Sequence, residues 1–213
     1  MNGHPDSNIR KEYSTPVPFA PHEDPFTQFE LWFADAKNSA ILEPNAMVLA
    51  TCSAAGEPSA RLVLLKGFDK RGFVFFSNYC SAKALELEEN PYAALVFYWD
   101  ILERQVRARG KVSKVSVAES TEYFKSRPRG AQISAAVSTQ SAPLDSRENL
   151  INSWNEFSEK YKDKEIPLPQ HWGGYVLSPI EFEFWQGAKD RMHERVKYLY
   201  SSETKWEQCR LWP

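Results

Sequence analysis

Short hydrophobic runs separated by turn residues fill the middle of this chain, and they restrict it to a largely β fold. The runs span residues 46–53, 59–68, 73–78, 93–99 and 105–112, and each has the length and composition of a strand. Residues 69–72 (Asp-Lys-Arg-Gly) predict a hairpin turn between the second run and the third. Strand patterns return from Trp172 onward. We therefore expect a mainly β fold with flanking helices, arranged as an antiparallel barrel.

Four helices are predicted beside these strands. The first begins at Asp24, which caps the helix, and has Pro25 as its first helical residue and an aromatic stripe facing the core. The others are expected at residues 81–89, capped by Ser81, at residues 116–123, and from about 145 to 161 with its apolar side chains inward.

Length and composition exclude several classes of protein. The 213 residues fit one domain, so we expect a mobile arm over residues 1–23 and a single domain over residues 24–213. A net charge of −2 argues against a nucleic-acid partner. The three cysteines and four histidines lack the spacing of metal ligands, so no metal is expected. Without a hydrophobic span or a signal peptide, we expect a cytoplasmic protein with no membrane partner.

The segment Arg-Met-His-Glu-Arg at residues 191–195 concentrates positive charge. If it is extended, period-two alternation places Arg191, His193 and Arg195 on one face. Two guanidiniums beside an imidazole repel one another unless an anion binds, so this face predicts a phosphorylated ligand. A solvated edge strand whose charges prevent aggregation explains the segment equally well.

Further cations flank the predicted strands. Arg61 and Lys66 stand at the two ends of an apolar run that predicts a buried strand, where a ligand or a second subunit would balance the charges. Internal salt bridges are the alternative. Lys83 follows Ser81 at a helix start, where free backbone amides favour phosphate, although this signal is weak alone.

Tyr123 and Arg127 stand four residues apart and offer a phenol and a guanidinium to a second phosphate, although such a pair is more often a surface contact. Both common glycine-rich nucleotide fingerprints are absent from the chain. A phosphorylated ligand must therefore be bound by side chains and helix ends.

Eight motifs link these residues in a fixed order: RLVLLKGF, FFSN, RQVR, YFKSRPRGAQI, STQS, WGGY, EFWQG and RMHER. In this order they resemble the pyridoxamine 5'-phosphate oxidase family, from about Arg10 to Pro213. The resemblance implies an FMN-binding split β-barrel and a homodimer with FMN at the subunit interface. It also implies oxidation of pyridoxamine 5'-phosphate and pyridoxine 5'-phosphate to pyridoxal 5'-phosphate in vitamin B6 salvage, with O2 as acceptor and H2O2 as product.

The resemblance further assigns site residues. Those expected to contact FMN are Arg61, Leu62, Val63, Leu64, Phe76, Ser77, Ala82, Lys83, Gln105, Gln140, Ser141, Trp185 and Arg195. Those expected to contact the substrate are Arg10, Lys11, Glu12 and Tyr13 of an arm that closes over it, and Lys66, Tyr123, Arg127, Ala131, Arg191, Met192 and His193. Arg191 and His193 are the expected catalytic residues. His193 either orients the substrate or moves a proton, and orientation is favoured because the cofactor performs the difficult step.

Four positions depart from the family pattern. Ala82 replaces a usual arginine and Ala131 a usual serine, which removes a cation from the FMN site and a hydroxyl from the substrate phosphate site. Met192 and Trp212 look like packing changes. The two alanines favour an alternative, a non-catalytic protein that binds FMN or pyridoxal phosphate. A nicotinamide-dependent flavin reductase is a third hypothesis, which the retained substrate-side residues disfavour.

Overall fold

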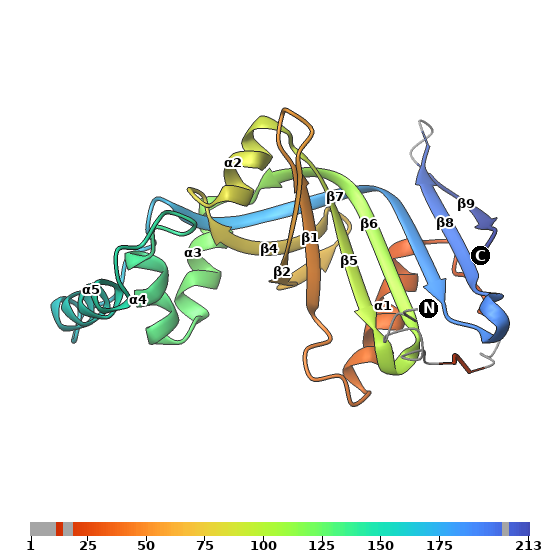
Figure 1. Cartoon of the computed structure of the whole chain (residues 1–213), viewed down its shortest axis with the longest axis horizontal. Coiled ribbons are helices and arrows are strands. Elements are labelled where there is room, and N and C mark those ends of the chain that lie inside the picture. Colours follow the sequence, from red (N-terminus) through yellow and green to blue (C-terminus); the bar gives the residue numbers. More distant parts are fainter. Residues whose placement is uncertain (1–11, 15–18, 202–204) are drawn as a thin grey trace, which may run out of the picture. The chain divides into compact units, whose positions relative to one another are not determined.

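The computed structural model describes residues 12–14, 19–201 and 205–213 (Figure 1). Its helices and strands are α1 (Pro25–Lys37), β1 (Ala46–Cys52), β2 (Pro58–Leu64), β3 (Gly67–Asp69), β4 (Gly72–Asn78), α2 (Ala82–Glu89), β5 (Tyr92–Trp99), η2 (Asp100–Leu102), β6 (Arg104–Lys114), α3 (Val117–Ser126), α4 (Arg129–Val137), α5 (Arg147–Lys160), β7 (Trp172–Gln186), η3 (Lys189–Arg191), β8 (Glu194–Tyr200) and β9 (Trp206–Leu211). The strand order is β2-β1-β5-β6-β7-β4-β3, and β8 pairs with both β7 and β9. The prediction of a mainly β fold with helices is confirmed.

The chain forms two compact units. Unit 1 comprises Met1–Pro44, Val96–Ala108 and Glu181–Pro213, and unit 2 comprises Asn45–Leu95 and Arg109–Ile180. Strands β5, β6 and β7 therefore contribute residues to both units. The expected site residues are divided between the units.

Aromatic packing around α1 stabilises unit 1. The Asp24 carboxylate accepts hydrogen bonds from the first amides of the helix, as its N-cap position requires. Phe29 and Trp32 are buried, with ring centroids 5.0 Å from Phe97 and 5.3 Å from Phe184 respectively. The first predicted helix and its buried aromatic stripe are confirmed.

Two hairpins organise unit 2. Strands β1 and β2 pair antiparallel, and β3 pairs with β4 in a register that places Asp69 opposite Gly72. Gly72 has φ +137°, and a Cβ there would lie 1.8 Å from the Leu177 carbonyl oxygen, so only glycine fits this position. The predicted turn at residues 69–72 is confirmed.

The predicted strand over residues 59–68 is wrong in two respects. It is broken after Leu64 because the backbone changes partner: the Leu65 amide donates to Asn45 O (2.8 Å), whereas the Lys66 amide donates to Val74 O (2.9 Å). It is also not buried, since β2 stands at one end of the strand order and Leu62 is 72% exposed. Arg61 and Lys66 thus do not stand at the two ends of one buried strand.

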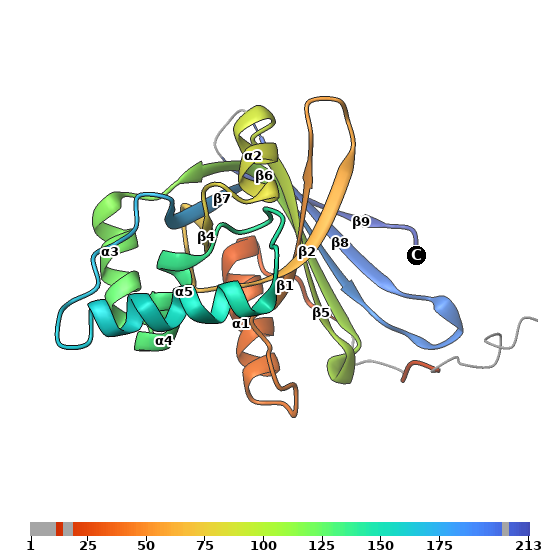
Figure 2. The ribbon, with the colours of Figure 1, turned by 60° about the vertical axis from the view of Figure 1, so that its left-hand side comes forward.

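The helices of unit 2 follow the predictions with two exceptions. Helices α2 and α3 form where expected, and the Ser116 hydroxyl caps α3 by accepting from the Glu119 amide. Helix α4 was not predicted because it starts after Pro128, which has no side-chain acceptor to signal an N-cap. Figure 2 shows α5 beside α4. Trp154, Phe157 and Tyr161 pack against a buried cluster, as predicted, whereas Leu150, also predicted to face inward, is 40% exposed. No helix in the described ranges is long and apolar enough to cross a membrane.

Candidate active site

A cavity of about 940 Å³ lies within unit 2, in the range typical of small-molecule sites. The expected site residues that line it are Arg61, Leu62, Val63, Leu64, Lys66, Phe76, Ser77, Ala82, Lys83, Tyr123, Arg127, Ala131, Gln140 and Ser141. Lining residues that the sequence reasoning missed include Asn78, Ser126, Ser134 and Ser138. Residues far apart in sequence that the resemblance assigned to one site therefore line one space.

Lys83 lies in this cavity as a buried cation and is only 9% exposed. Its ammonium donates to neutral oxygens of Ser77 (3.2 Å), Ser81 (3.1 Å) and Gln140 (3.2 Å). Within the described part of the chain, no carboxylate forms an ion pair with it. Burial lowers the pKa of Lys83, and the positive charge of Arg61 lowers it further. An anion bound here would raise the pKa of Lys83 and so oppose both effects.

Ser81 occupies the N-cap position of α2, but its side chain does not cap the helix as predicted. Its hydroxyl instead donates to Asn78 O (2.7 Å) and accepts from Lys83. The start of α2 is thereby left without a side-chain cap beside the buried ammonium, and such helix ends favour phosphate.

Arg61, in contrast, has an internal partner. Its guanidinium forms an ion pair with Glu86 (3.2 Å) and also hydrogen-bonds to the hydroxyls of Thr51 and Ser59. The hydrogen bond from Thr51 is the main cause that lowers the pKa of Glu86, and Ser59 and Arg61 lower it further. The salt-bridge alternative is thus correct for Arg61. Glu86 was missed because only the fold brings α2 to β2.

A second cationic centre lies over an aromatic stack in the same cavity. Phe76 stacks on Tyr123 (3.9 Å between centroids) and on Trp172 (5.4 Å). The Arg127 guanidinium lies 4.8 Å from the Trp172 centroid, and the Lys66 ammonium lies 6.0 Å from that of Tyr123. Burial lowers the pKa of Arg127.

The Nη1 atom of Arg127 is buried and finds no hydrogen-bond partner in the described ranges. Leaving such a donor unsatisfied costs about 1–3 kcal/mol, more when it is charged. Lys83 and Arg127 thus give the cavity two cations without an ion-pair partner in the described ranges, and the cavity also contains a flat aromatic surface. The residues present therefore fit phosphorylated ring compounds, including a flavin mononucleotide.

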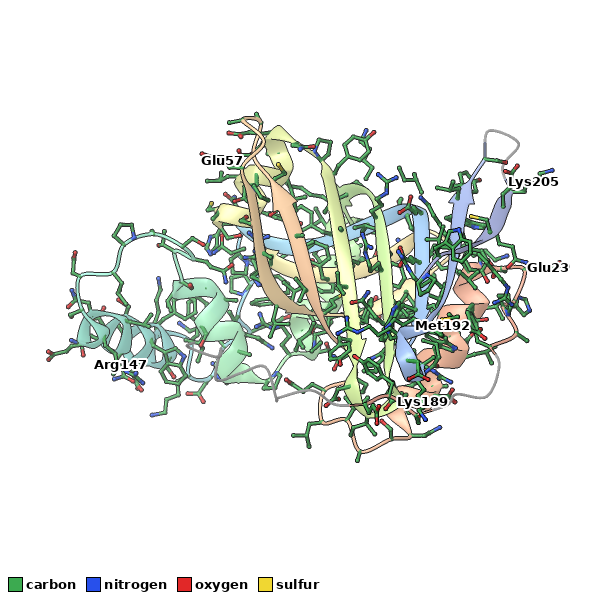
Figure 3. The ribbon with its side chains drawn as sticks, turned by 45° about the vertical axis from the view of Figure 1, so that its right-hand side comes forward. Glu23, Glu57, Arg147, Lys189, Met192 and Lys205 are labelled. Carbon is green, nitrogen blue, oxygen red and sulfur yellow. The ribbon has the colours of Figure 1, made fainter. Side chains whose placement is uncertain are left out.

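The charged segment at residues 191–195 lies in unit 1 and is extended only from Glu194 onward. Residues Lys189–Arg191 form the short helix η3, with Asp190 and Arg191 at φ 55° and 63°, and β8 begins only at Glu194. The predicted alternation is wrong because this tight left-handed turn connects β7 to β8. Figure 3 labels Lys189 and Met192 in this connection, and Met192 is 69% exposed. Non-glycine residues at positive φ store strain and are concentrated at functional sites.

Arg195 is balanced by a carboxylate that the sequence reasoning also missed. Its Nη2 and Nε atoms lie 2.8 and 2.9 Å from the Glu183 carboxylate, which Arg107 also approaches at 3.3 Å. Trp185 is the direct strand partner of Arg195. Glu183 is therefore the diagonal neighbour of Arg195 on the same face of the sheet. This pairing could be predicted only with the strand register in hand. The Nη1 atom of Arg195 donates to Trp212 O (2.9 Å).

His193 lies between two aromatic rings of unit 1. Its ring centroid is 4.7 Å from that of Trp185 and 5.5 Å from that of Tyr13, and its Nδ1 accepts from the Ala188 amide (3.1 Å). Burial lowers the pKa of His193, and the charge of Arg191 adds to this effect.

Those remaining expected residues that the structure describes make no contact that indicates a ligand. Glu12 and Arg191 are exposed, and Gln105 is half-buried on β6. Arg10 and Lys11 lie outside the described residues.

Comparison with solved structures defines the class. The crystal structure of PhzG from Burkholderia lata 383, in complex with tetrahydrophenazine-1-carboxylic acid, has a TM-score of 0.89 and 29% identity over 94% of this chain and 100% of that one. A pyridoxamine 5'-phosphate oxidase-related, FMN-binding protein from Nostoc punctiforme shares the fold alone, with a TM-score of 0.72 at 15% identity over 89% of this chain and 98% of that one. The fold is the split β-barrel of FMN-binding proteins.

Sequence comparison narrows the class to one family. The family model for pyridoxamine 5'-phosphate oxidase matches residues 33–153, and the model for the pyridoxine 5'-phosphate oxidase C-terminal dimerisation region matches residues 172–213. Pyridoxine/pyridoxamine 5'-phosphate oxidases from Rippkaea orientalis and Salinibacter ruber are 55% and 49% identical. These matches cover 89% and 97% of this chain, and 90% and 98% of the relatives. The chain belongs to the pyridoxamine 5'-phosphate oxidase family and is an oxidoreductase.

Proposed function

We propose that the enzyme oxidises pyridoxamine 5'-phosphate and pyridoxine 5'-phosphate to pyridoxal 5'-phosphate in vitamin B6 salvage, with FMN as cofactor, O2 as acceptor and H2O2 as product. When bound, FMN supplies the redox chemistry by accepting the hydride that leaves C4' of the substrate. The names of the relatives, which match along nearly the whole chain, support this assignment.

One observation carries the proposal: a single cavity contains two cationic positions that lack an acidic partner in the described ranges, the Lys83 ammonium and the Arg127 Nη1 atom. The reaction needs two phosphate sites, one for FMN and one for the substrate. Lys83, with Ser77 and Gln140, would bind the FMN phosphate. Arg127, with Lys66 and Tyr123, would bind the substrate phosphate, because a guanidinium and a phenol donate hydrogen bonds to phosphate oxygens.

The residues of unit 1 would position the rings. Trp185 and Arg195 would contact the flavin, and Arg191 would hold the substrate pyridine against it. Tyr13 would exclude water from the reacting atoms, since its ring already covers Trp185 and His193. A hydride transfer between two stacked rings requires this orientation more than it requires a strong nucleophile.

A homodimer with FMN at the subunit interface is part of the proposal. Support comes from the match to a dimerisation region and from the exposure of the apolar Leu62, which lies on the edge strand β2 and lines the cavity. A second copy would cover this surface.

The test is anaerobic reduction. Pyridoxine 5'-phosphate is added to the FMN-loaded enzyme without oxygen, and the visible absorbance of oxidised flavin is followed. We expect the absorbance to disappear, and admission of air to restore it with the formation of pyridoxal 5'-phosphate. Unphosphorylated pyridoxine is the matched control and should reduce the flavin far more slowly, because it leaves Arg127 without a partner.

The competing proposal is a protein that binds FMN or pyridoxal phosphate without turnover. The observation in its favour is that Ala82 and Ala131 both line the cavity and offer it no polar side chain. Bound FMN that stays oxidised in the anaerobic experiment would support that protein and refute the oxidase. Flavin reduction by a nicotinamide cofactor alone would instead indicate a flavin reductase.

A further inference from the structure

The short connection between β7 and β8 fixes the imidazole of His193 from one side. Ala188 is only 9% exposed, and its amide donates to Nδ1 of His193 over 3.1 Å. A buried amide requires an acceptor, and no carbon atom of the ring can serve as one. The nitrogen that faces Ala188 therefore carries a lone pair and no proton.

The amide of Ala188 is itself held in place. The preceding Gly187 amide donates to Glu103 O (2.7 Å), and the Gln186 side-chain amide donates to Leu102 O (3.1 Å) and Glu103 O (3.2 Å). A Cβ on Gly187 would lie 2.9 Å from Tyr13 Cδ1, so the backbone approaches the ring cluster as closely as glycine allows. These contacts prevent the Ala188 amide from turning away from His193.

The ring cannot easily reverse its orientation either. Trp185 and Tyr13 contact it at interplanar angles of 46° and 83°. Among the described residues, the Arg191 guanidinium and the Tyr13 phenol are the charged and titratable groups found beside it. A second proton at Nδ1 would break the bond from Ala188 and place a cation beside Arg191, so the neutral ring is favoured.

A neutral imidazole has one N–H, and here it must be at the other nitrogen. We infer that His193 is locked as the neutral Nε2–H tautomer and serves the reaction as a hydrogen-bond donor to a lone pair of the substrate, not as a proton acceptor. This inference rests on the proposed function only for the identity of the substrate. The Ala188 amide is the positioning group, and Gln186, Gly187 and the Leu102–Glu103 carbonyls support it.

The deciding experiment is nitrogen NMR of histidine-labelled, FMN-loaded enzyme. The four histidines are distinguished by recording the same spectrum of His193→Gln, in which the His193 signals are lost. At about pH 7 we expect an unprotonated Nδ1 and a protonated Nε2, as the network requires. A protonated Nδ1, alone or as imidazolium, would overturn the inference. Because no substrate is present, this result is independent of whether the proposed oxidation occurs.

Two substitutions of His193 test the same inference by enzyme kinetics. A glutamine amide nitrogen reaches the place of Nε2, whereas asparagine reaches only the place of Nδ1. We expect His193→Gln to retain about 10- to 100-fold more kcat/KM than His193→Asn, because one hydrogen bond to the substrate is kept. Equal loss in both variants, together with an acid limb in the wild-type pH profile, would indicate proton acceptance and refute the inference.

Discussion

The burial of single cations in the cavity destabilises the folded chain, and a bound anion would offset this effect. Lys83 is the clearest example, since a buried ammonium surrounded by neutral oxygens is destabilising in the folded protein. Arg61 is a cation of the same cavity whose charge Glu86 already balances. The residues proposed to bind phosphate are thus the ones that lack an ion-pair partner in the described ranges.

Replacement of Lys83 by methionine tests this reasoning. We expect Lys83→Met to weaken FMN binding about 10- to 100-fold, because a charged hydrogen bond to phosphate is lost. The same change should leave the FMN-free protein as stable as the wild type or more stable. Fluorescence titration with FMN and urea denaturation measure the two effects. Lys70→Met, at an exposed position, is the control, and an unchanged FMN affinity of Lys83→Met would contradict this account.

The two alanines of the cavity permit tests by gain of function. Ala82→Arg adds a cation beside Lys83 and should tighten FMN binding, whereas Ala131→Ser adds a hydroxyl and should lower the KM for the phosphorylated substrate. Each new hydrogen bond to a charged group is worth about 1.5–3 kcal/mol, so the expected gain is about tenfold or more. FMN titration and steady-state kinetics measure the gains. If neither constant improves, the departures from the family pattern do not limit binding.

Contacts between elements hold the charged residues in position. Glu86 on α2 connects Thr51 of β1 to Ser59 and Arg61 of β2. These bonds stabilise the ionised carboxylate of Glu86 in the folded state. Its pKa therefore lies below the ordinary value of 4.5. Its contribution to stability is therefore present above about pH 4.5 and disappears as the pH falls through the lower folded-state value.

Glu86→Gln should remove this pH dependence. At about pH 7 we expect the variant to be about 1–2 kcal/mol less stable than the wild type, because a charged acceptor of several hydrogen bonds becomes neutral. The difference should shrink as the pH falls from about 5 to about 3. Urea unfolding midpoints across this range measure it. A difference that stays constant with pH would show that Glu86 does not act as a carboxylate.

The connection between β7 and β8 depends on one small residue. Gly187→Ala would place a Cβ 2.9 Å from Tyr13 Cδ1 and 3.1 Å from Glu103 Cβ, which forces the Tyr13 ring away from His193. We expect kcat/KM to fall about 10- to 100-fold, as for other small misplacements of catalytic groups. Gly67→Ala is the matched control, because no atom lies within 4 Å of its added Cβ. Equal kinetics of the two variants would contradict a positioning role for this connection.

Elements with a local signal could be predicted from the sequence. Asp24 before Pro25, and Ser116 before Glu119, identify helix starts because capping depends on neighbouring residues. The break after Leu64 could not be predicted, since it arises when the backbone exchanges one partner strand for another. The same holds for the left-handed turn at Arg191, whose sequence contains no glycine.

The resemblance assigned to one site a set of residues that the structure brings around one cavity, whereas physical pattern alone singled out mainly its cations and Tyr123. Alternation along residues 191–195 gave a wrong geometry, although His193 does lie beside Trp185. The carboxylates Glu86 and Glu183 were missed because each meets its arginine only through the strand register or helix packing. The pairing of opposite charges in a site thus could not be predicted from the sequence and required the structure.

At the scale of the whole molecule, the exposed edge strand β2 offers a surface that the proposed homodimer would cover. Leu62 is apolar yet 72% exposed, and it lines the cavity. Such apolar surface beside a ligand site is typical of a subunit interface. A homodimer would therefore both cover β2 and complete the flavin site.

Leu62→Glu tests this dependence. A carboxylate buried between two copies costs several kcal/mol, so we expect the variant to be monomeric at concentrations where the wild type is dimeric. If the flavin lies between subunits, the monomer should also lose FMN binding, and FMN should promote dimerisation of the wild type by mass action. Sedimentation velocity with and without FMN measures both effects. Leu42→Glu is the control, because Leu42 is 97% exposed in the connection before β1 and does not line the cavity. A monomeric Leu62→Glu protein that still binds FMN with wild-type affinity would separate dimerisation from cofactor binding and place the flavin site within one chain.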